Sequence, residues 1–226
     1  MTRFVYLHGF ASSPQSGKAQ FYRKRFEELG IDLHIPVLDA GNFTALTISG
    51  QLRVLDENIS GEPAVLIGSS MGGYLAALYA ARHPNIEKLV MLAPALRFPS
   101  RWRERYSNEE LTAWKQTGTA LVYHYGYQRE VPLGYQLMDD SLGYEDEPEF
   151  TQPALILHGE LDTVVPAVIS TGFAATRPNV TLRLFDSGHE LTDVLEDLWE
   201  ETSRFLFGSA NPGGRKPGSP DMRNGI

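Results

Sequence analysis

Apolar-rich runs and longer amphipathic stretches alternate along most of this chain. The runs are typical of buried strands and lie at 4–7, 31–38, 64–67, 89–92, 154–157 and 180–185. The stretches between them have apolar residues at helical spacing. The first predicts a helix over 17–29, whose shared face carries Ala19, Tyr22, Phe26 and Leu29. This alternation favours an α/β fold, with a mostly parallel sheet and helices on both of its faces.

The same spacing predicts the helices that follow. Thr44 is placed to cap a second helix, whose apolar face carries Ala45, Ile48, Leu52, Leu55 and Ile59. The last helix carries on one side Leu191, Val194, Leu195, Leu198, Thr202 and Phe205. A chain of 226 residues suits one domain, which we expect over residues 1–206. Residues 207–226 are rich in Gly, Pro and charge, which predicts a disordered tail without an assigned function.

The alternation stops at about residue 95 and resumes after about residue 150. Ten of the 24 aromatic residues of the chain fall in this interval, so we interpret it as a cap inserted over a site. Residues 108–116 predict a helix, and Tyr123, Tyr125 and Tyr127 alternate as in a strand. Two interpretations of the aromatic rings stay open. They line a pocket, or they only pack the cap onto the core.

Composition excludes several classes of function. The chain has no cysteine, so disulfides and a cysteine nucleophile are excluded. Its net charge of -8 disfavours nucleic acid as a partner. We interpret Arg101, Arg103 and Arg105, diluted by nearby glutamates, as a solvated helix face. The N-terminus lacks a secretory layout and no apolar run is long enough for a bilayer, so we expect a soluble, cytoplasmic protein without a membrane partner.

The most informative motif is Gly68-x-Ser70-x-Gly72. It follows the apolar run 64–67 and precedes a helix, and this strand–turn–helix context is that of a nucleophile elbow. The two glycines leave room beside a sharp turn, so that Ser70 is exposed at its tip. The helix N-terminus then directs free N–H groups toward whatever Ser70 attacks.

A serine hydroxyl needs a base within hydrogen-bond reach, and the base needs an acid that orients it. His189 follows the last strand, and Asp162 follows the strand before it. Because parallel strands direct their C-terminal loops to one edge of the sheet, both side chains can meet Ser70 there. Glu160 is the rival acid, and Ser69 is one residue away from the turn position.

The other five histidines are rivals for the role of base. His8 and His158 end strands and are expected to be structural, with side chains bonded to loop backbone. His34 lies in a strand and His83 at a helix end. His124, in the cap, has two interpretations, contact with substrate or a position at the surface, and we expect the surface position. The histidines are scattered without paired spacing, so we expect no metal site.

Together these segments resemble the α/β-hydrolase superfamily over residues 3–206. Four pieces carry the resemblance: the His8-Gly9 loop, the Gly68–Gly72 turn, Gly159-x-x-Asp162-x-x-Val165-Pro166 and Gly188-His189. The chain order Ser70, Asp162, His189 is that of this superfamily. The opening His-Gly-Phe-x-Ser-Ser most resembles small bacterial serine esterases of the YqiA/YcfP type. Two leading strands of larger members are missing, so the resemblance implies about six strands.

The resemblance implies a serine carboxylesterase that needs no cofactor and acts on small to medium apolar esters. Ser70 would form an acyl-enzyme, His189 would move the proton and Asp162 would orient His189. The oxyanion would bind the backbone N–H of Met71, by its position after the nucleophile, and that of Phe10, by resemblance. Three alternatives stay open: an acyl-thioesterase, a lyase with the same triad, and a non-catalytic binding protein. The physiological substrate and the oligomeric state also stay open.

Overall fold

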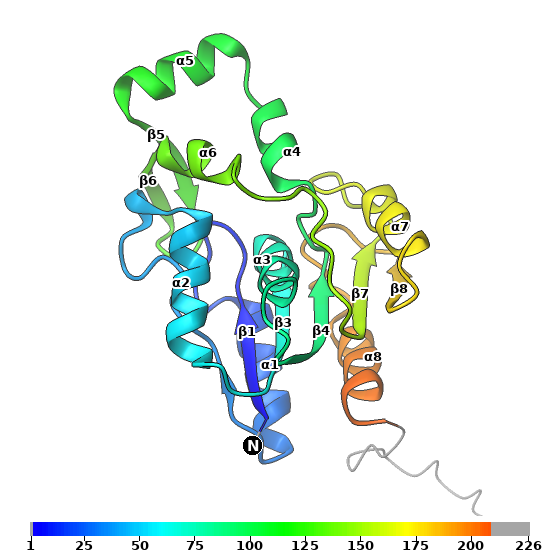
Figure 1. Ribbon diagram of the computed structural model, residues 1–226. Helices are drawn as coiled ribbons and strands as arrows, with labels where there is room; N and C mark the ends of the chain where they lie inside the picture. The colour runs from blue at the N-terminus through cyan, green and yellow to red at the C-terminus, as the bar shows by residue number, and fades with distance from the viewer. Residues whose placement is uncertain (1, 209–226) are drawn as a thin grey trace, which may run out of the picture.

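The computed structural model describes residues 2–208, and its centre is a sheet of six parallel strands (Figure 1). The strands, in chain order, are β1 (Arg3–Leu7), β2 (Leu33–His34), β3 (Ala64–Ser69), β4 (Ile86–Leu92), β7 (Ala154–Gly159) and β8 (Val180–Phe185). Their order in the sheet is β2-β1-β3-β4-β7-β8, and every neighbouring pair is parallel. The predicted parallel sheet of about six strands is therefore confirmed.

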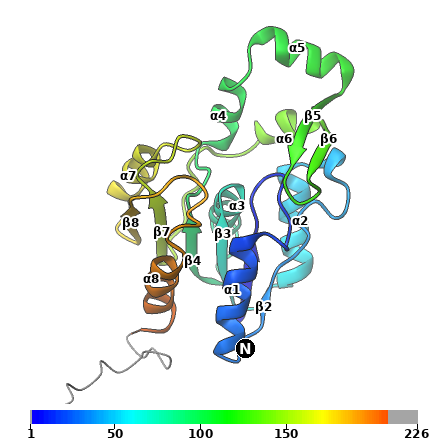
Figure 2. The same cartoon turned by 180° about the vertical axis from the view of Figure 1, so that it is seen from behind.

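Helices cover both faces of this sheet. One face packs against α2 (Ile48–Ile59), α3 (Met71–Ala80) and α7 (Ala167–Ala175), and the other against α1 (Gly17–Glu28) and α8 (Leu195–Phe207) (Figures 1 and 2). Right-handed crossovers produce this division, because the chain crosses the sheet in opposite directions from β1 and from β3. Every residue of α3 is buried, which fixes the position of the turn that precedes it.

Some element boundaries differ from the prediction. The strand predicted over 31–38 pairs with β1 only at Leu33 and His34, since it lies at the sheet edge and Pro36 has no N–H to donate. Helix α2 is capped by Thr47, which accepts a hydrogen bond from the Gly50 N–H. Thr44 instead lies in a short 3-10 helix, η1 (Phe43–Ala45).

The last helix also begins later than predicted, at Leu195. Leu191 has a φ of 54°, a left-handed conformation that no helix residue adopts, and it lies in the loop that follows β8. The tail predicted from residue 207 contains the last helical residue, Phe207, while residues 209–226 lie outside the described part of the chain.

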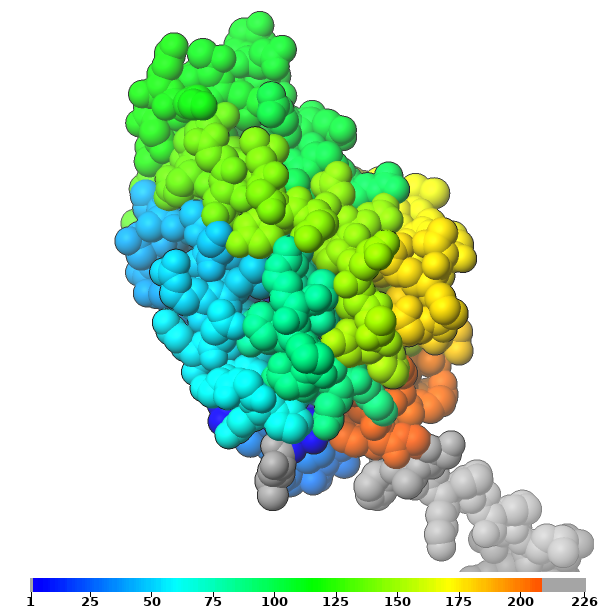
Figure 3. Space-filling model, in the orientation of Figure 1, coloured from blue at the N-terminus to red at the C-terminus, as the bar shows by residue number. Residues whose placement is uncertain are grey.

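We call the segment between β4 and β7, residues 93–153, the cap. Most of it lies beyond the C-terminal ends of the strands, and its last residues, 145–153, return beside α3 to the start of β7 (Figure 1). It contains α4 (Phe98–Glu104), α5 (Asn108–Thr117), β5 (Thr119–His124), β6 (Arg129–Gly134) and α6 (Gln136–Ser141). It projects above the sheet in Figure 1 and forms a separate lobe in Figure 3.

The aromatic residues of the cap differ in burial, and Tyr106, Tyr135 and Tyr144 are half-buried. Phe98, Trp102, Trp114 and Phe150 are buried, whereas the Tyr123, Tyr125 and Tyr127 side chains are exposed. Only Tyr123 of these tyrosines lies in a strand. None of the helices within residues 2–208 combines the length and apolar composition that crossing a bilayer requires.

Candidate active site

Ser70 occupies the sharp turn between β3 and α3. Its φ of 53° and ψ of -116° are strained for a residue with a side chain, as a nucleophile elbow requires. The turn leaves no room beside it. A Cβ atom on Gly68 would lie 2.2 Å from the Gly72 carbonyl oxygen, and one on Gly72 would lie 2.1 Å from the Leu7 carbonyl oxygen. The motif glycines are therefore required by backbone contacts on both sides of Ser70.

The three side chains predicted from distant loops meet in one hydrogen-bonded row. His189 Nε2 lies 2.9 Å from Ser70 Oγ, and His189 Nδ1 lies 2.7 Å from Asp162 Oδ2. Ser70 comes from the β3–α3 turn, Asp162 from the loop after β7, and His189 from the loop after β8. With its proton on Nδ1, the imidazole donates to the carboxylate and can accept a proton from the serine hydroxyl.

Asp162 is buried, and hydrogen bonds surround its carboxylate. Oδ1 accepts the backbone N–H groups of Val164 and Val165, each at 2.8 Å. Oδ2 lies between two imidazoles, at 3.1 Å from His158 Nε2 as well as 2.7 Å from His189 Nδ1. Burial alone would raise the pKa of Asp162, but the hydrogen bonds from His158, His189 and the Val165 N–H outweigh it and hold that pKa well below its usual range. The Asp162 carboxylate is therefore held ionised.

The two N–H groups proposed for an oxyanion are free of internal partners. Within residues 2–208, neither Phe10 N–H nor Met71 N–H donates a hydrogen bond. Met71 is the first residue of α3, where the helix dipole favours negative charge. A Cβ atom on Gly9 would lie 3.5 Å from the Ser70 Cβ, so the loop that carries Phe10 is adjacent to the serine.

The rival residues lie elsewhere or have other partners. Glu160 is exposed, and Ser69 is buried within β3. His8 is bonded to loop backbone, as expected, since Nδ1 lies 3.0 Å from the Gly9 carbonyl oxygen. His34 binds the Asn58 side chain, and His83 binds the backbone carbonyl of Tyr79.

The expectation that His124 lies at the surface is wrong. It is 1% exposed and lies between two rings, stacked on Tyr127 at 3.9 Å and edge-on to Phe43 at 4.6 Å. Desolvation in this position lowers the pKa of His124. Strands β5 and β6 pair antiparallel as a hairpin, which packs onto the loop after β1 and onto η1. The local sequence pattern of the cap does not encode this long-range contact.

Two contacts of the site were not predicted. His158 is bonded to loop backbone, as expected, through the Val165 carbonyl oxygen, and it also reaches the Asp162 carboxylate. Arg101, interpreted as part of a solvated helix face, donates from Nη2 to the Val164 carbonyl oxygen at 2.6 Å, so that α4 of the cap is bonded to the Asp162 loop. The spacing of His158 four residues before Asp162 was the available signal for the first contact.

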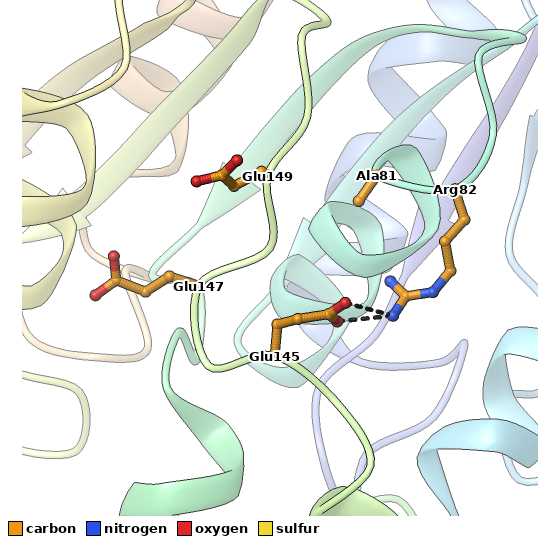
Figure 4. A pocket seen from close by; sticks show the side chains of 5 residues that line it. All are labelled: Ala81, Arg82, Glu145, Glu147 and Glu149. Carbon is orange, nitrogen blue, oxygen red and sulfur yellow. Dashed lines mark hydrogen bonds and ion pairs between the residues drawn. The ribbon is translucent and has the colours of Figure 1, made fainter.

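A surface pocket of about 400 Å³ lies at the C-terminal end of α3, away from these residues. It is lined by Ala81, Arg82, Glu145, Glu147 and Glu149 (Figure 4). Arg82 Nη2 donates to both carboxylate oxygens of Glu145, at 3.0 and 2.7 Å. No group of His, Asp and Glu side chains within residues 2–208 is arranged to hold a metal ion.

Comparison with known proteins relates the chain to one family and one fold. The family model described as "Uncharacterised protein family (UPF0227)" matches residues 3–205. Monoacylglycerol lipase abhd6-B of Xenopus laevis is 27% identical over 175 residues, which are 71% of this chain and 48% of the lipase. The chain thus spans about half the length of this curated relative.

Solved structures superpose on most of this chain. A protein of Agrobacterium vitis S4 superposes with a TM-score of 0.76 at 23% identity, covering 91% of this chain and 88% of the other. The monoacylglycerol lipase of Paleococcus ferrophilus superposes with a TM-score of 0.72 at 16% identity, covering 91% and 95%. The chain therefore has the α/β-hydrolase fold.

Proposed function

The chain belongs to the uncharacterised protein family UPF0227, and from this premise we propose that it is a serine hydrolase that cleaves carboxylic esters. The observation that carries the proposal is the row of hydrogen bonds from Ser70 Oγ through His189 to Asp162, at 2.9 and 2.7 Å. This arrangement activates a serine for attack on a carbonyl carbon.

Acylation follows from this geometry. Ser70 Oγ attacks the ester carbonyl carbon while His189 Nε2 takes the hydroxyl proton. The carbonyl oxygen becomes an anion, which the N–H groups of Phe10 and Met71 bind; one such donor stabilises a transition state by roughly 2.7–4 kcal/mol. The tetrahedral intermediate then expels the alcohol, which takes the proton from His189 and leaves an acyl ester on Ser70.

Deacylation uses the same groups, with water as the nucleophile and Ser70 as the leaving group. His189 takes a proton from water as its oxygen attacks the acyl carbon. The second intermediate releases the carboxylic acid, and Ser70 Oγ recovers its proton from His189. Asp162 stays ionised throughout, in keeping with its lowered pKa, and stabilises the imidazolium in both steps.

The aromatic surroundings of Phe10 favour an apolar substrate. The Phe10 ring packs edge-on against Trp102 of the cap at 4.7 Å and lies 5.6 Å from Phe43. These rings border the loop that carries one proposed oxyanion donor, so the acyl or alcohol group bound beside it is expected to be apolar and of small to medium size. Two relatives named as monoacylglycerol lipases agree with an ester of this kind.

A panel of nitrophenyl esters of increasing acyl length, assayed beside acyl-thioesters, tests the proposal. Ser70→Ala should lower turnover on the order of 10⁴-fold or more. Ser69→Ala, the neighbouring buried serine, should retain activity and serves as the matched control. The ratio of ester to thioester turnover assigns the leaving group. Equal turnover by wild type and Ser70→Ala, or none by either, would favour a non-catalytic binding protein.

A further inference from the structure

A second histidine–serine pair is bonded to the same carboxylate oxygen as His189. His158 Nε2 lies 3.1 Å from Asp162 Oδ2, and His158 Nδ1 lies 2.8 Å from Ser170 Oγ of α7. Both side chains of this pair are fully buried. The hydrogen bonds therefore extend beyond the triad, in the order Ser70, His189, Asp162, His158 and Ser170.

The neighbours of His158 determine which nitrogen carries its proton. Nε2 faces two acceptors, Asp162 Oδ2 and the Val165 carbonyl oxygen at 2.9 Å, and neither can donate. Nε2 must therefore carry hydrogen. Nδ1 of the neutral ring then accepts the hydroxyl proton of Ser170, which has no other partner among the hydrogen bonds of residues 2–208. Each polar atom of the ring is satisfied in this tautomer.

We propose that His158 is a positioning residue for ester hydrolysis, which holds Asp162 Oδ2 in the orientation that His189 needs. The inference rests on the proposed function. The Val164 and Val165 N–H groups hold Oδ1, and the donor from His158 is the second hydrogen bond on Oδ2, the oxygen that faces His189. Ser170 acts one step further away, by holding the tautomer of His158.

The N–H donor of His158 also affects how strongly the Asp162 carboxylate stabilises the protonated form of His189. A neutral N–H donor on Oδ2 withdraws charge from the carboxylate, so its removal makes the carboxylate a stronger partner for the imidazolium. The other charged groups near Asp162 are the Arg101 guanidinium of α4 and the Lys18 ammonium of α1, and Glu190 lies near Lys18. These groups are unchanged in a His158 variant, which isolates the effect of the donor.

Two substitutions separate positioning from packing. In His158→Gln, the amide nitrogen carries two hydrogens in the place of Nε2 and can serve both acceptors. His158→Leu fills a similar volume without any donor. We expect His158→Leu to lower kcat for a nitrophenyl ester roughly 10- to 100-fold at nearly unchanged KM, because His158 does not touch substrate. His158→Gln should restore most of the loss.

The pH profile supplies a readout that a purely structural role would not move. The acid limb of kcat/KM in His158→Leu should shift to higher pH, and that of His158→Gln should stay near wild type. Ser170→Ala should change kcat and the acid limb of kcat/KM in the same direction as His158→Leu, but by a smaller amount. If His158→Leu does not fold, Ser170→Ala decides the question with these same measurements.

The tautomer can be measured on the wild-type protein without any substrate. Long-range proton–nitrogen NMR correlations, assigned through the signals lost in His158→Gln, should show hydrogen on Nε2 of His158. Hydrogen on Nδ1 instead, or a His158→Leu variant with wild-type kcat and acid limb, would overturn the inference.

Labelling of Ser70 by a fluorophosphonate keeps the two proposals apart. If wild type is not labelled and hydrolyses no ester, the proposed function fails, and the inference fails with it. If wild type is labelled while His158→Leu matches it in rate and pH profile, only the inference fails.

Discussion

The backbone N–H of Tyr125 donates a hydrogen bond of 2.8 Å to the carbonyl oxygen of Ala11. Tyr125 lies in the connection between β5 and β6, and Ala11 follows Phe10, a proposed oxyanion donor. Ala11 has a φ of 50°, a conformation that a residue with a side chain adopts only when its surroundings hold it. The cap hairpin therefore supports the loop from which an oxyanion would be bound.

Gly126→Ala should weaken this support. A Cβ atom at residue 126 would lie 2.8 Å from the Ser13 Cβ and 3.1 Å from His124 Cε1, so the hairpin must move away from the loop. Because small displacements of a binding group reduce turnover strongly, we expect kcat/KM for a nitrophenyl ester to fall about tenfold.

Gly172→Ala is the matched control for this substitution. A Cβ atom at residue 172, in α7, meets no atom within 4 Å. The Gly172→Ala variant should retain activity, and its free energy of unfolding should rise by up to about 1 kcal/mol because alanine has a better helix propensity than glycine. Wild-type kcat/KM in Gly126→Ala would show that the hairpin does not support the loop.

The strain at Ser70 predicts a difference between two inactive variants. Alanine keeps a Cβ atom at a φ of 53°, whereas glycine adopts this conformation without cost. Relief of strain exceeds the greater freedom of glycine in the unfolded chain, so Ser70→Gly should be more stable than Ser70→Ala by about 1 kcal/mol. Urea unfolding of both variants measures this difference, and equal midpoints would mean that the turn stores no strain.

The turn that carries Ser70 and the loops of its two hydrogen-bonded partners could be predicted from sequence, because each depends on local pattern. Gly68 and Gly72 mark a strand–turn–helix segment within five residues, and the two other loops follow apolar strands. In a parallel sheet the C-terminal loops of neighbouring strands share one edge. Short-range signals and this one rule suffice to place Ser70, Asp162 and His189 together.

The contacts that sequence did not predict depend on long-range packing. His124 lies in a polar, turn-rich stretch, and only the return of the hairpin onto Phe43 buries it. The position of His158 at a strand end places its side chain near the following loop. That position does not determine whether the imidazole also contacts the Asp162 carboxylate. Arg101 was interpreted as solvated because its partner, the Val164 carbonyl oxygen, is 63 residues away in the sequence. The two are adjacent only in the folded protein.

The Lys18 side chain is expected to make the stability of the protein depend on pH. Burial lowers the pKa of Lys18 to about 8, although Glu190 and Asp162 oppose this shift. The folded protein therefore binds its proton less tightly than the unfolded chain, and the charged lysine costs stability below pH 8. The cost declines as pH rises toward the ordinary value of 10.5.

Lys18→Met should therefore raise the free energy of unfolding at pH 7 and raise it less at pH 9.5, measured by urea titration at both values. Lys24→Met, at a position on the same helix where the side chain is exposed, controls for loss of a lysine. A gain that is the same at both pH values would mean that Lys18 is not desolvated.

The Asp162 carboxylate contributes stability, whereas the charged Lys18 ammonium costs it, and both contributions become more favourable as pH rises. Its pKa is lowered in the folded protein, so the folded state holds this proton less tightly than the unfolded chain does. The stability that this carboxylate contributes is complete above the ordinary carboxyl range near pH 4 and is lost as pH falls toward the lowered pKa. Asp162→Asn should therefore be less stable than wild type at pH 7, and the difference should shrink between about pH 5 and pH 2.

Urea unfolding at intervals across this range measures the effect, and Glu160→Gln is its control. Glu160 is exposed and its side chain has no hydrogen bond within residues 2–208, so the stability of Glu160→Gln should run parallel to that of wild type. If the gap between wild type and Asp162→Asn stays constant down to pH 2, the carboxylate is not held ionised by His158 and His189. The electrostatic part of the proposed mechanism would then need another source.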